Sequence, residues 1–220
     1  MKKILLFNII VISSIINGFS QARWTFDLNF EDVYNVPMPL TIKQNGYPDI
    51  KFIAKFTADA FTAPVCWDWR FSRWENGKSW EIEAIHDKLY LINTNDEITK
   101  YSISHGFNII TINRGFEKKF VSYKIGVGTI LIHPESVIRG MGFGSSSDYT
   151  DFGYFITGPI LMFTICKPIQ FCDRFYLNFE GKTSFAYSYV KVAKGYSNLY
   201  NFAFHVGIGL GFDFIKPHKE

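Results

Sequence analysis

The last extended segment of the chain alternates between large apolar residues and small or polar residues without interruption. From Tyr200 to Phe214 every second side chain is large and apolar, while the intervening positions include Asn201, His205 and three glycines. A period of two is the period of a β-strand, whose successive side chains point to opposite faces. Such a strand is typical of a barrel wall, with the apolar face turned to lipid and the small, polar face turned to a lumen.

The same alternation recurs upstream, in residues 24–31, 50–57, 65–72, 80–84, 121–131 and 175–189. Segments 98–112 and 154–165 are also apolar and rich in β-formers. Asn45-Gly46 and Asn76-Gly77 between such runs predict tight hairpin turns. We therefore expect an all-β fold, an antiparallel up-and-down transmembrane β-barrel of about eight to ten strands. Segments 24–31 and 40–43 could add a hairpin to the wall, which would raise the number of strands from about eight to about ten.

The longest interruption of the pattern, residues 133–151, is rich in glycine and serine and predicts one large mobile loop. Outer-membrane barrels begin and end in the periplasm and keep their long loops outside. This rule places the glycine-serine loop outside and the connection near Pro168 in the periplasm.

The N-terminus predicts export. Lys2 and Lys3 precede an apolar run over residues 4–16, and Ser20 and Ala22 occupy the positions of a cleavage site. The run is shorter than the roughly 20 residues that a membrane-spanning helix needs. We therefore expect a signal peptide over residues 1–22 and a barrel domain over residues 23–220. The net charge of +3 is spread along the chain, which gives no reason to expect binding to nucleic acid.

These features together resemble the small outer-membrane β-barrel proteins of Gram-negative bacteria. The aromatic-rich last strand adds Phe214, which is similar to the terminal aromatic that such barrels present to their assembly machinery, although this chain continues for six more residues. The resemblance implies export through the periplasm to the cell outer membrane, with membrane lipid and the assembly machinery as partners. It does not imply an activity, because a fold does not fix a function.

Several charged residues fall on the inward face of the predicted strands: Arg70, Glu81, Glu83, Lys124, Glu180, Lys182 and His205. The interior of so narrow a barrel is filled by side chains, so inward charges must pair. The sequence therefore predicts a salt-bridge network that plugs the lumen, and a structural or surface-interaction role in which residues 134–151 would be the contact surface. A narrow channel is the alternative if the lumen is open to water.

An envelope lipid-modifying enzyme is a further alternative, since some small outer-membrane barrels resemble acyltransferases or deacylases that use histidine with serine and a carboxylate. The candidate residues are His86, His105, His133, Glu135 and Ser136. No G-x-S-x-G motif accompanies them. Sequence neighbours on a strand also point to opposite faces, which weakens Ser104 with His105 as a catalytic pair.

The three cysteines allow one disulfide. Cys166 and Cys172 flank a short predicted periplasmic turn in an oxidising compartment, so a bridge between them is expected as one possibility. The other possibility is that both pack as free, small apolar residues. Because the sequence has no C-x-x-C pair, we expect no structural metal site, and nothing in it suggests a cofactor.

Overall fold

The computed structural model describes residues 22–144 and 153–214. The predicted signal peptide, apart from Ala22, and the central part of the glycine-serine loop lie outside the described residues. The described residues form thirteen strands: β1 (Arg23–Val36), β2 (Met38–Gln44), β3 (Ile50–Ala54), β4 (Phe56–Thr57), β5 (Trp67–Glu75), β6 (Lys78–Leu91), β7 (Ile98–Glu117), β8 (Ser122–Ile132), β9 (Glu135–Ile138), β10 (Met141–Phe143), β11 (Phe155–Gln170), β12 (Phe175–Val192) and β13 (Gly195–Asp213). Over these ranges, no helix has the length and apolar character to cross a membrane.

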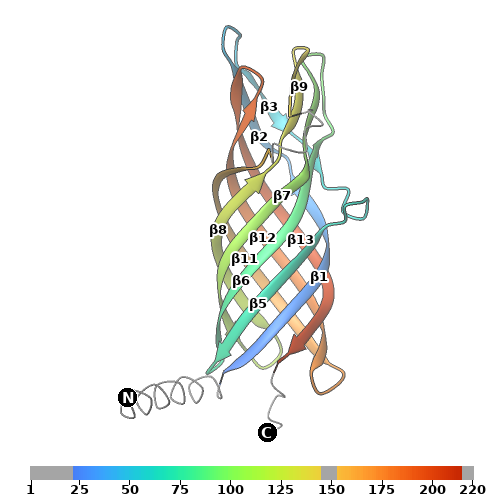
Figure 1. Cartoon of the computed structure of the whole chain (residues 1–220), viewed down its shortest axis with the longest axis vertical. Helices are drawn as coiled ribbons and strands as arrows, with labels where there is room; N and C mark the ends of the chain where they lie inside the picture. The colour runs from blue at the N-terminus through green and yellow to red at the C-terminus, as the bar shows by residue number, and fades with distance from the viewer. Residues whose placement is uncertain (1–21, 145–152, 215–220) are drawn as a thin grey trace, which may run out of the picture.

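Eight strands form a barrel wall in the order β1, β5, β6, β7, β8, β11, β12 and β13 (Figure 1). Each pairs antiparallel with a neighbour on both sides, and β13 pairs back to β1, so the ring closes. The predicted fold class is confirmed, with eight strands in the wall. Segment 24–31 belongs to the wall, whereas segment 50–57 does not.

The other five strands, together with the tops of β6, β7, β12 and β13, build an extension at the end opposite the termini (Figure 1). In it β2 pairs with β3 and with the start of β13, and β9 pairs with β10 and the start of β7. The prediction of one mobile loop over 133–151 is therefore wrong for its first part. Arg139 and Gly140, with φ of 52° and 72°, make a tight hairpin turn there.

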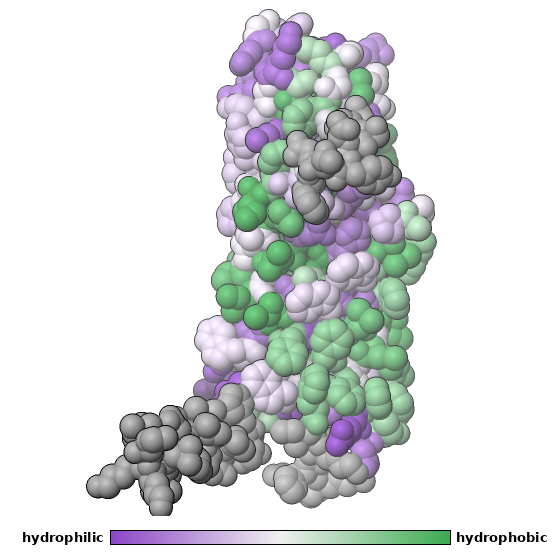
Figure 2. Space-filling model, viewed as in Figure 1, coloured by the Kyte–Doolittle hydropathy of each residue, from purple (hydrophilic) through white to green (hydrophobic). Residues whose placement is uncertain are grey.

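The outer face of the wall carries an apolar band. Its exposed side chains include Phe26, Leu28, Phe30, Ile82, Ile112, Ile125, Val127, Leu161, Phe179, Val206, Ile208 and Leu210. Figure 2 shows hydrophobic residues gathered over the lower part of one face and hydrophilic residues concentrated toward the extension. So large an exposed apolar surface is stable only in contact with lipid, which identifies the lower wall as the membrane-spanning part.

The interior changes character along the barrel. In the membrane-spanning part the inward side chains are polar or charged, whereas in the extension they form an apolar core. On β7, for example, Asn113 and Thr111 face the lower lumen, while Ile109, Phe107 and Ile103 are buried in the upper core. The extension therefore has an apolar interior, as a soluble β-protein does. The membrane-spanning part has the opposite arrangement, with a polar interior and an apolar outer face.

Candidate functional site

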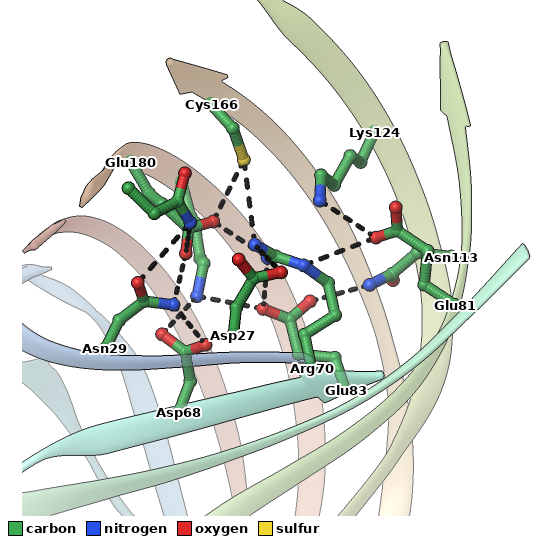
Figure 3. Close-up of polar contacts among 12 residues, drawn as sticks. Asp27, Asn29, Asp68, Arg70, Glu81, Glu83, Asn113, Lys124, Cys166 and Glu180 are labelled. Atoms are coloured by element: carbon green, nitrogen blue, oxygen red, sulfur yellow. Dashed lines mark hydrogen bonds and ion pairs between the residues drawn. The ribbon is translucent and has the colours of Figure 1, made fainter. Parts of the chain in front are cut away.

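One ionic network occupies the membrane-spanning lumen, and it contains all seven charged residues that the sequence placed on the inward face. Figure 3 shows the part of the network around Arg70, with Glu81, Glu83, Lys124 and Glu180. Each of the seven is buried, with at most 5% of its surface exposed. They reach one another because the residues alternate strictly along β5, β6, β8, β12 and β13, and the strands curve around a narrow interior.

Arg70, on β5, is the centre of the network. Its guanidinium lies 2.8 Å from Glu180, 3.1 Å from Glu83, 3.3 Å from Asp27 and 3.5 Å from Glu81. These four carboxylates come from β1, β6 and β12, so one side chain ties three other strands across the lumen. The planar fork of five N–H donors suits arginine to this position, since lysine presents only three donors from a single point.

Lys182 forms the second centre, closer to the extension. Its ammonium pairs with Glu31, lies 2.8 Å from Asp68 and lies 2.9 Å from Glu83. Glu31 also binds Nδ1 of His205 at 3.1 Å. Since Glu83 contacts both Arg70 and Lys182, the two centres form one cluster.

The network has more acidic than basic groups. Its cations are Arg70, Lys124, Lys182 and, when protonated, His205, and its carboxylates are Asp27, Glu31, Asp68, Glu81, Glu83 and Glu180. Neutral donors stabilise the surplus carboxylates: Asn113 donates to Glu83 at 2.6 Å, and Tyr176 donates to Asp27 at 2.8 Å. Every cation in the cluster therefore touches a carboxylate, and the arginine touches four.

Sequence reasoning did not single out several members of this cluster, among them Asp27, Asn29, Glu31 and Asp68. The signal was available, because all four fall on the polar positions of alternating segments. For Asp27, Asn29 and Glu31, the inward direction depended on segment 24–31 being a wall strand, which the sequence left open. The structure places that segment between β13 and β5, and its polar face therefore points into the lumen.

Of the two possibilities for Cys166 and Cys172, the structure has the free thiols and not the disulfide. Cys66, Cys166 and Cys172 are all free thiols. Cys166 points into the lumen from β11, where its thiol lies 3.0 Å from a Glu180 oxygen, whereas Cys172 is exposed in the turn before β12. The two side chains lie in different environments, because Cys166 occupies an inward-facing position of β11 and its thiol points into the lumen, away from the turn.

The lumen is open on one side of Arg70 and filled on the other. Toward the termini, a cavity of about 150 Å³ forms the mouth of the barrel, and Arg70 and Lys124 are among its lining residues. Toward the extension, Lys182 and His205 are followed by the apolar core, which includes Ile85, Ile109 and Ile130. Charged and then apolar side chains thus succeed one another along the inward face.

Three of the five candidate catalytic residues meet outside the barrel wall, on the surface of the extension. Nδ1 of His105 lies 3.1 Å from Oε1 of Glu135, and the rings of His105 and His133 are 4.9 Å apart. Partial burial and the neighbouring His105 lower the pKa of His133 from its ordinary value. Ser104 Oγ lies 3.5 Å from the same Nδ1 that faces Glu135. In a serine-histidine-acid relay the acid and the serine engage different ring nitrogens, so this arrangement does not form one.

The remaining two candidates are not brought to this cluster. Ser136 is buried on the opposite face of β9 from Glu135. His86 stacks on Trp67 at 5.6 Å, and its Nδ1 lies 2.8 Å from the Asn108 side-chain oxygen. In the part of the chain that the structure describes, no three His, Cys, Asp or Glu residues are arranged to hold a metal ion.

Comparison with known proteins supports the fold alone. No family model and no curated protein matches the sequence. The structure is similar to that of the outer-membrane protein AlkL, with a TM-score of 0.52, 11% identity, and coverage of 91% of this chain and 93% of AlkL. Ail, the attachment invasion locus protein of Yersinia pestis, gives a TM-score of 0.38 at 10% identity, and Neisserial surface protein A gives 0.40 at 8%; each match covers 88% of this chain and 97% of the other. The chain thus has the fold of small Gram-negative outer-membrane β-barrels.

Proposed function

We propose that the chain is an integral outer-membrane protein with a sealed lumen, and that it serves as an anchor for a rigid surface-interaction platform built by its extension. The observation that carries this proposal is the filled inward face. From Arg70 upward, paired charges and then close-packed apolar side chains occupy the interior. Such a barrel holds strands together without offering ions a continuous water path.

The platform is held together at its top by Arg139, in the turn between β9 and β10. Its guanidinium binds the Glu97 carboxylate at 2.6 Å and the Pro48 carbonyl at 2.9 Å, and it lies 5.0 Å above the Tyr47 ring. These partners belong to the turns after β6 and β2. Three hairpins are therefore joined by one side chain, and loops held on a rigid scaffold are where binding is usually placed.

The geometry gives less support to the two alternatives. A channel requires a route past Arg70, whose four carboxylate contacts cross the lumen. A lipid-modifying enzyme requires a nucleophile and an acid on the two nitrogens of one histidine, and His105 has Ser104 and Glu135 on the same nitrogen.

Conductance measurements test the sealed lumen. Purified protein reconstituted in planar bilayers should give no current steps above those of the lipid, with a bacterial porin in the same bilayers as a positive control. Steady, voltage-independent steps from the parent protein would overturn the proposal of a sealed lumen. Incubation with radiolabelled phospholipid and outer-membrane glycolipid should give no released or transferred acyl chain, and an activity lost in His105→Ala would favour the enzyme instead.

The platform is tested separately from the lumen. Proteoliposomes carrying the parent and a variant in which Glu135–Phe143 is replaced by a short glycine-serine linker should be compared on glycan and matrix-protein arrays. Binding by the parent that the variant loses is expected, because the hairpin is part of the platform. Equal binding by both, or none by either, would contradict a role for the platform.

A further inference from the structure

The outer face of the wall has a groove at the upper border of the apolar band, where β11 and β12 separate. Pairing between these strands begins at Ile160 and Ala186. Above that level β11 keeps its pairing with β8 along its other edge, where an irregularity lies between Ile156 and Gly158. Pro159 follows directly and has no N–H to donate to a neighbouring strand. Above Ala186, β12 therefore has no paired strand on this side among the described residues, although the Gly158 backbone still lies close to the Tyr187 carbonyl.

The groove has a volume of about 400 Å³, and its lining residues are Tyr154, Phe155, Ile156, Thr157, Tyr189 and Lys191. Ile156 is 74% exposed, and Tyr189 is 43% exposed. Directly below the groove lie Leu161 and Phe185, which pair across the two strands and point outward into the apolar band. The floor of the groove is thus continuous with the surface that contacts lipid hydrocarbon.

Cationic side chains border the upper rim. Lys191 Nζ lies 4.1 Å from the centroid of the Phe155 ring. Lys191 is the cross-strand partner of Tyr196, and Tyr196 is the partner of Lys43 on β2, so the two lysines flank one tyrosine on the outward face. Among the ion pairs of the described residues Lys191 has none, and Lys43 has only a 3.8 Å contact with Asp49. Both ammonium groups are available to an anion.

Aromatic side chains mark this height as the membrane-water border. Tyr189 stacks on Tyr196 at 4.5 Å, and Tyr187 contacts Tyr200 at 5.2 Å. Tyrosine concentrates at the headgroup level because its ring is apolar and its hydroxyl is polar. Since the extension lies outside the cell in the proposed orientation, this border belongs to the outer leaflet.

We propose that the groove binds one phosphate-bearing lipid of the outer leaflet. An acyl chain lies between β11 and β12 against Ile156 and Phe155, and the headgroup phosphate pairs with Lys191 and Lys43. The occupant follows from complementarity: an apolar groove open to hydrocarbon on its lower side and bordered by cations on its upper side fits an anionic amphiphile. The inference rests on the proposed outer-membrane location and not on the sealed lumen.

The test is lipid retention by the purified barrel. Native mass spectrometry in detergent should compare bis-phosphorylated lipid A with the same lipid after removal of its phosphates. The parent should retain the phosphorylated form about tenfold more strongly, as one charge-assisted contact contributes on the order of a factor of ten. Lys191→Gln should lose most of that preference. Lys118→Gln, which removes the same charge in the turn before β8 at the opposite end of the barrel, should keep it.

A second variant tests the acyl part of the groove. Ile156→Ser should weaken retention of both lipid forms, because it removes exposed apolar surface without disturbing the packed interior. Equal retention of the two lipid forms by the parent, or unchanged retention in Lys191→Gln, would overturn the proposal. Recovery of the exported chain in a fraction other than the outer membrane would contradict the location, and bilayer conductance would contradict only the sealed lumen.

Discussion

The centre of the lumen network gives the most direct test of how the barrel is stabilised. Arg70→Met replaces the guanidinium with an unbranched apolar side chain and leaves four buried carboxylates without their shared cation. Breaking a single buried ion pair by removing one partner costs about 3–5 kcal/mol. With four carboxylates affected, we expect a loss of stability at the upper end of that range, about 5 kcal/mol. Domains of this size commonly have a total stability of about 5–15 kcal/mol.

A matched control lies on the same strand. Arg73 makes the same kind of ion pair with Glu75 at 2.8 Å, but a third of its side-chain surface and more than two fifths of that of Glu75 are exposed. Arg73→Met should therefore change stability by less than about 1 kcal/mol. The Arg70 and Arg73 variants differ in burial and in the number of partners, and not in the chemistry of the replacement.

Removal of one carboxylate should have a smaller effect than removal of Arg70. Glu180→Ala leaves Arg70 with three carboxylates and Lys182 with its own three, so no buried cation becomes unpaired. The loss is then limited to the hydrogen bonds that Glu180 accepts and to the cavity left by its side chain, about 2–3 kcal/mol. We therefore expect the loss of stability to be largest for Arg70→Met, intermediate for Glu180→Ala and smallest for Arg73→Met.

Urea unfolding in detergent micelles, followed by tryptophan fluorescence, measures these differences. If Arg70→Met unfolds within about 1 kcal/mol of the parent, the lumen is solvated and the reasoning from burial is refuted.

Three further predictions concern the wall, the thiols and the platform. Gly209→Ala should destabilise the barrel by about 1–3 kcal/mol, because the new Cβ would lie 2.1 Å from the Leu28 carbonyl oxygen. Gly181→Ala is the control, since its new Cβ meets no atom within 4 Å and should be tolerated. Equal unfolding midpoints of the two variants would contradict this prediction. In unreduced protein, a maleimide should label Cys172 before unfolding and Cys66 and Cys166 only after it, and failure to label all three in denaturant would restore the disulfide. Arg139→Ala should speed proteolysis of the β9–β10 hairpin while the barrel keeps its unfolding midpoint, and unchanged proteolysis would show that Arg139 does not hold the platform together.

The inward or outward direction of the strand side chains, which we call their parity, was the part of the structure that the sequence predicted best. The strict alternation of β13 assigned an inward or outward direction to each side chain, and the same rule placed Arg70, Glu83 and Lys182 inside the barrel. Parity predicts direction without distance, so it did not show that Arg70 contacts four carboxylates from three strands. Those contacts depend on how strands far apart in sequence curve toward one another.

The extension was harder to predict for two physical reasons. In β7 the pattern loses its contrast, because Ile103 and Phe107 fill the upper core while Ile110 and Ile112 face lipid, so both parities are apolar. The β9–β10 hairpin lies in a segment whose glycine and serine content favours a loop. The hairpin is stabilised by the pairing of β9 with β7, a non-local contact that composition does not reveal.

On β6, β7 and β8 the inward residues change from polar to apolar at the height where the outer face also changes. Glu83, Thr111 and Gly128 are cross-strand partners on these three strands. The next inward residues on the same strands are Ile85, Ile109 and Ile130, whereas Asp68, the partner of Ile85 on β5, stays charged. Over the same interval the outward residue of β7 changes from Ile110 to Asn108. A strand that passes from lipid into water must exchange the chemistry of both faces, and a single row is the shortest distance over which alternation allows it. On β6, β7 and β8 the border of the membrane therefore coincides with a change of side-chain character on the inner face as well as on the outer face.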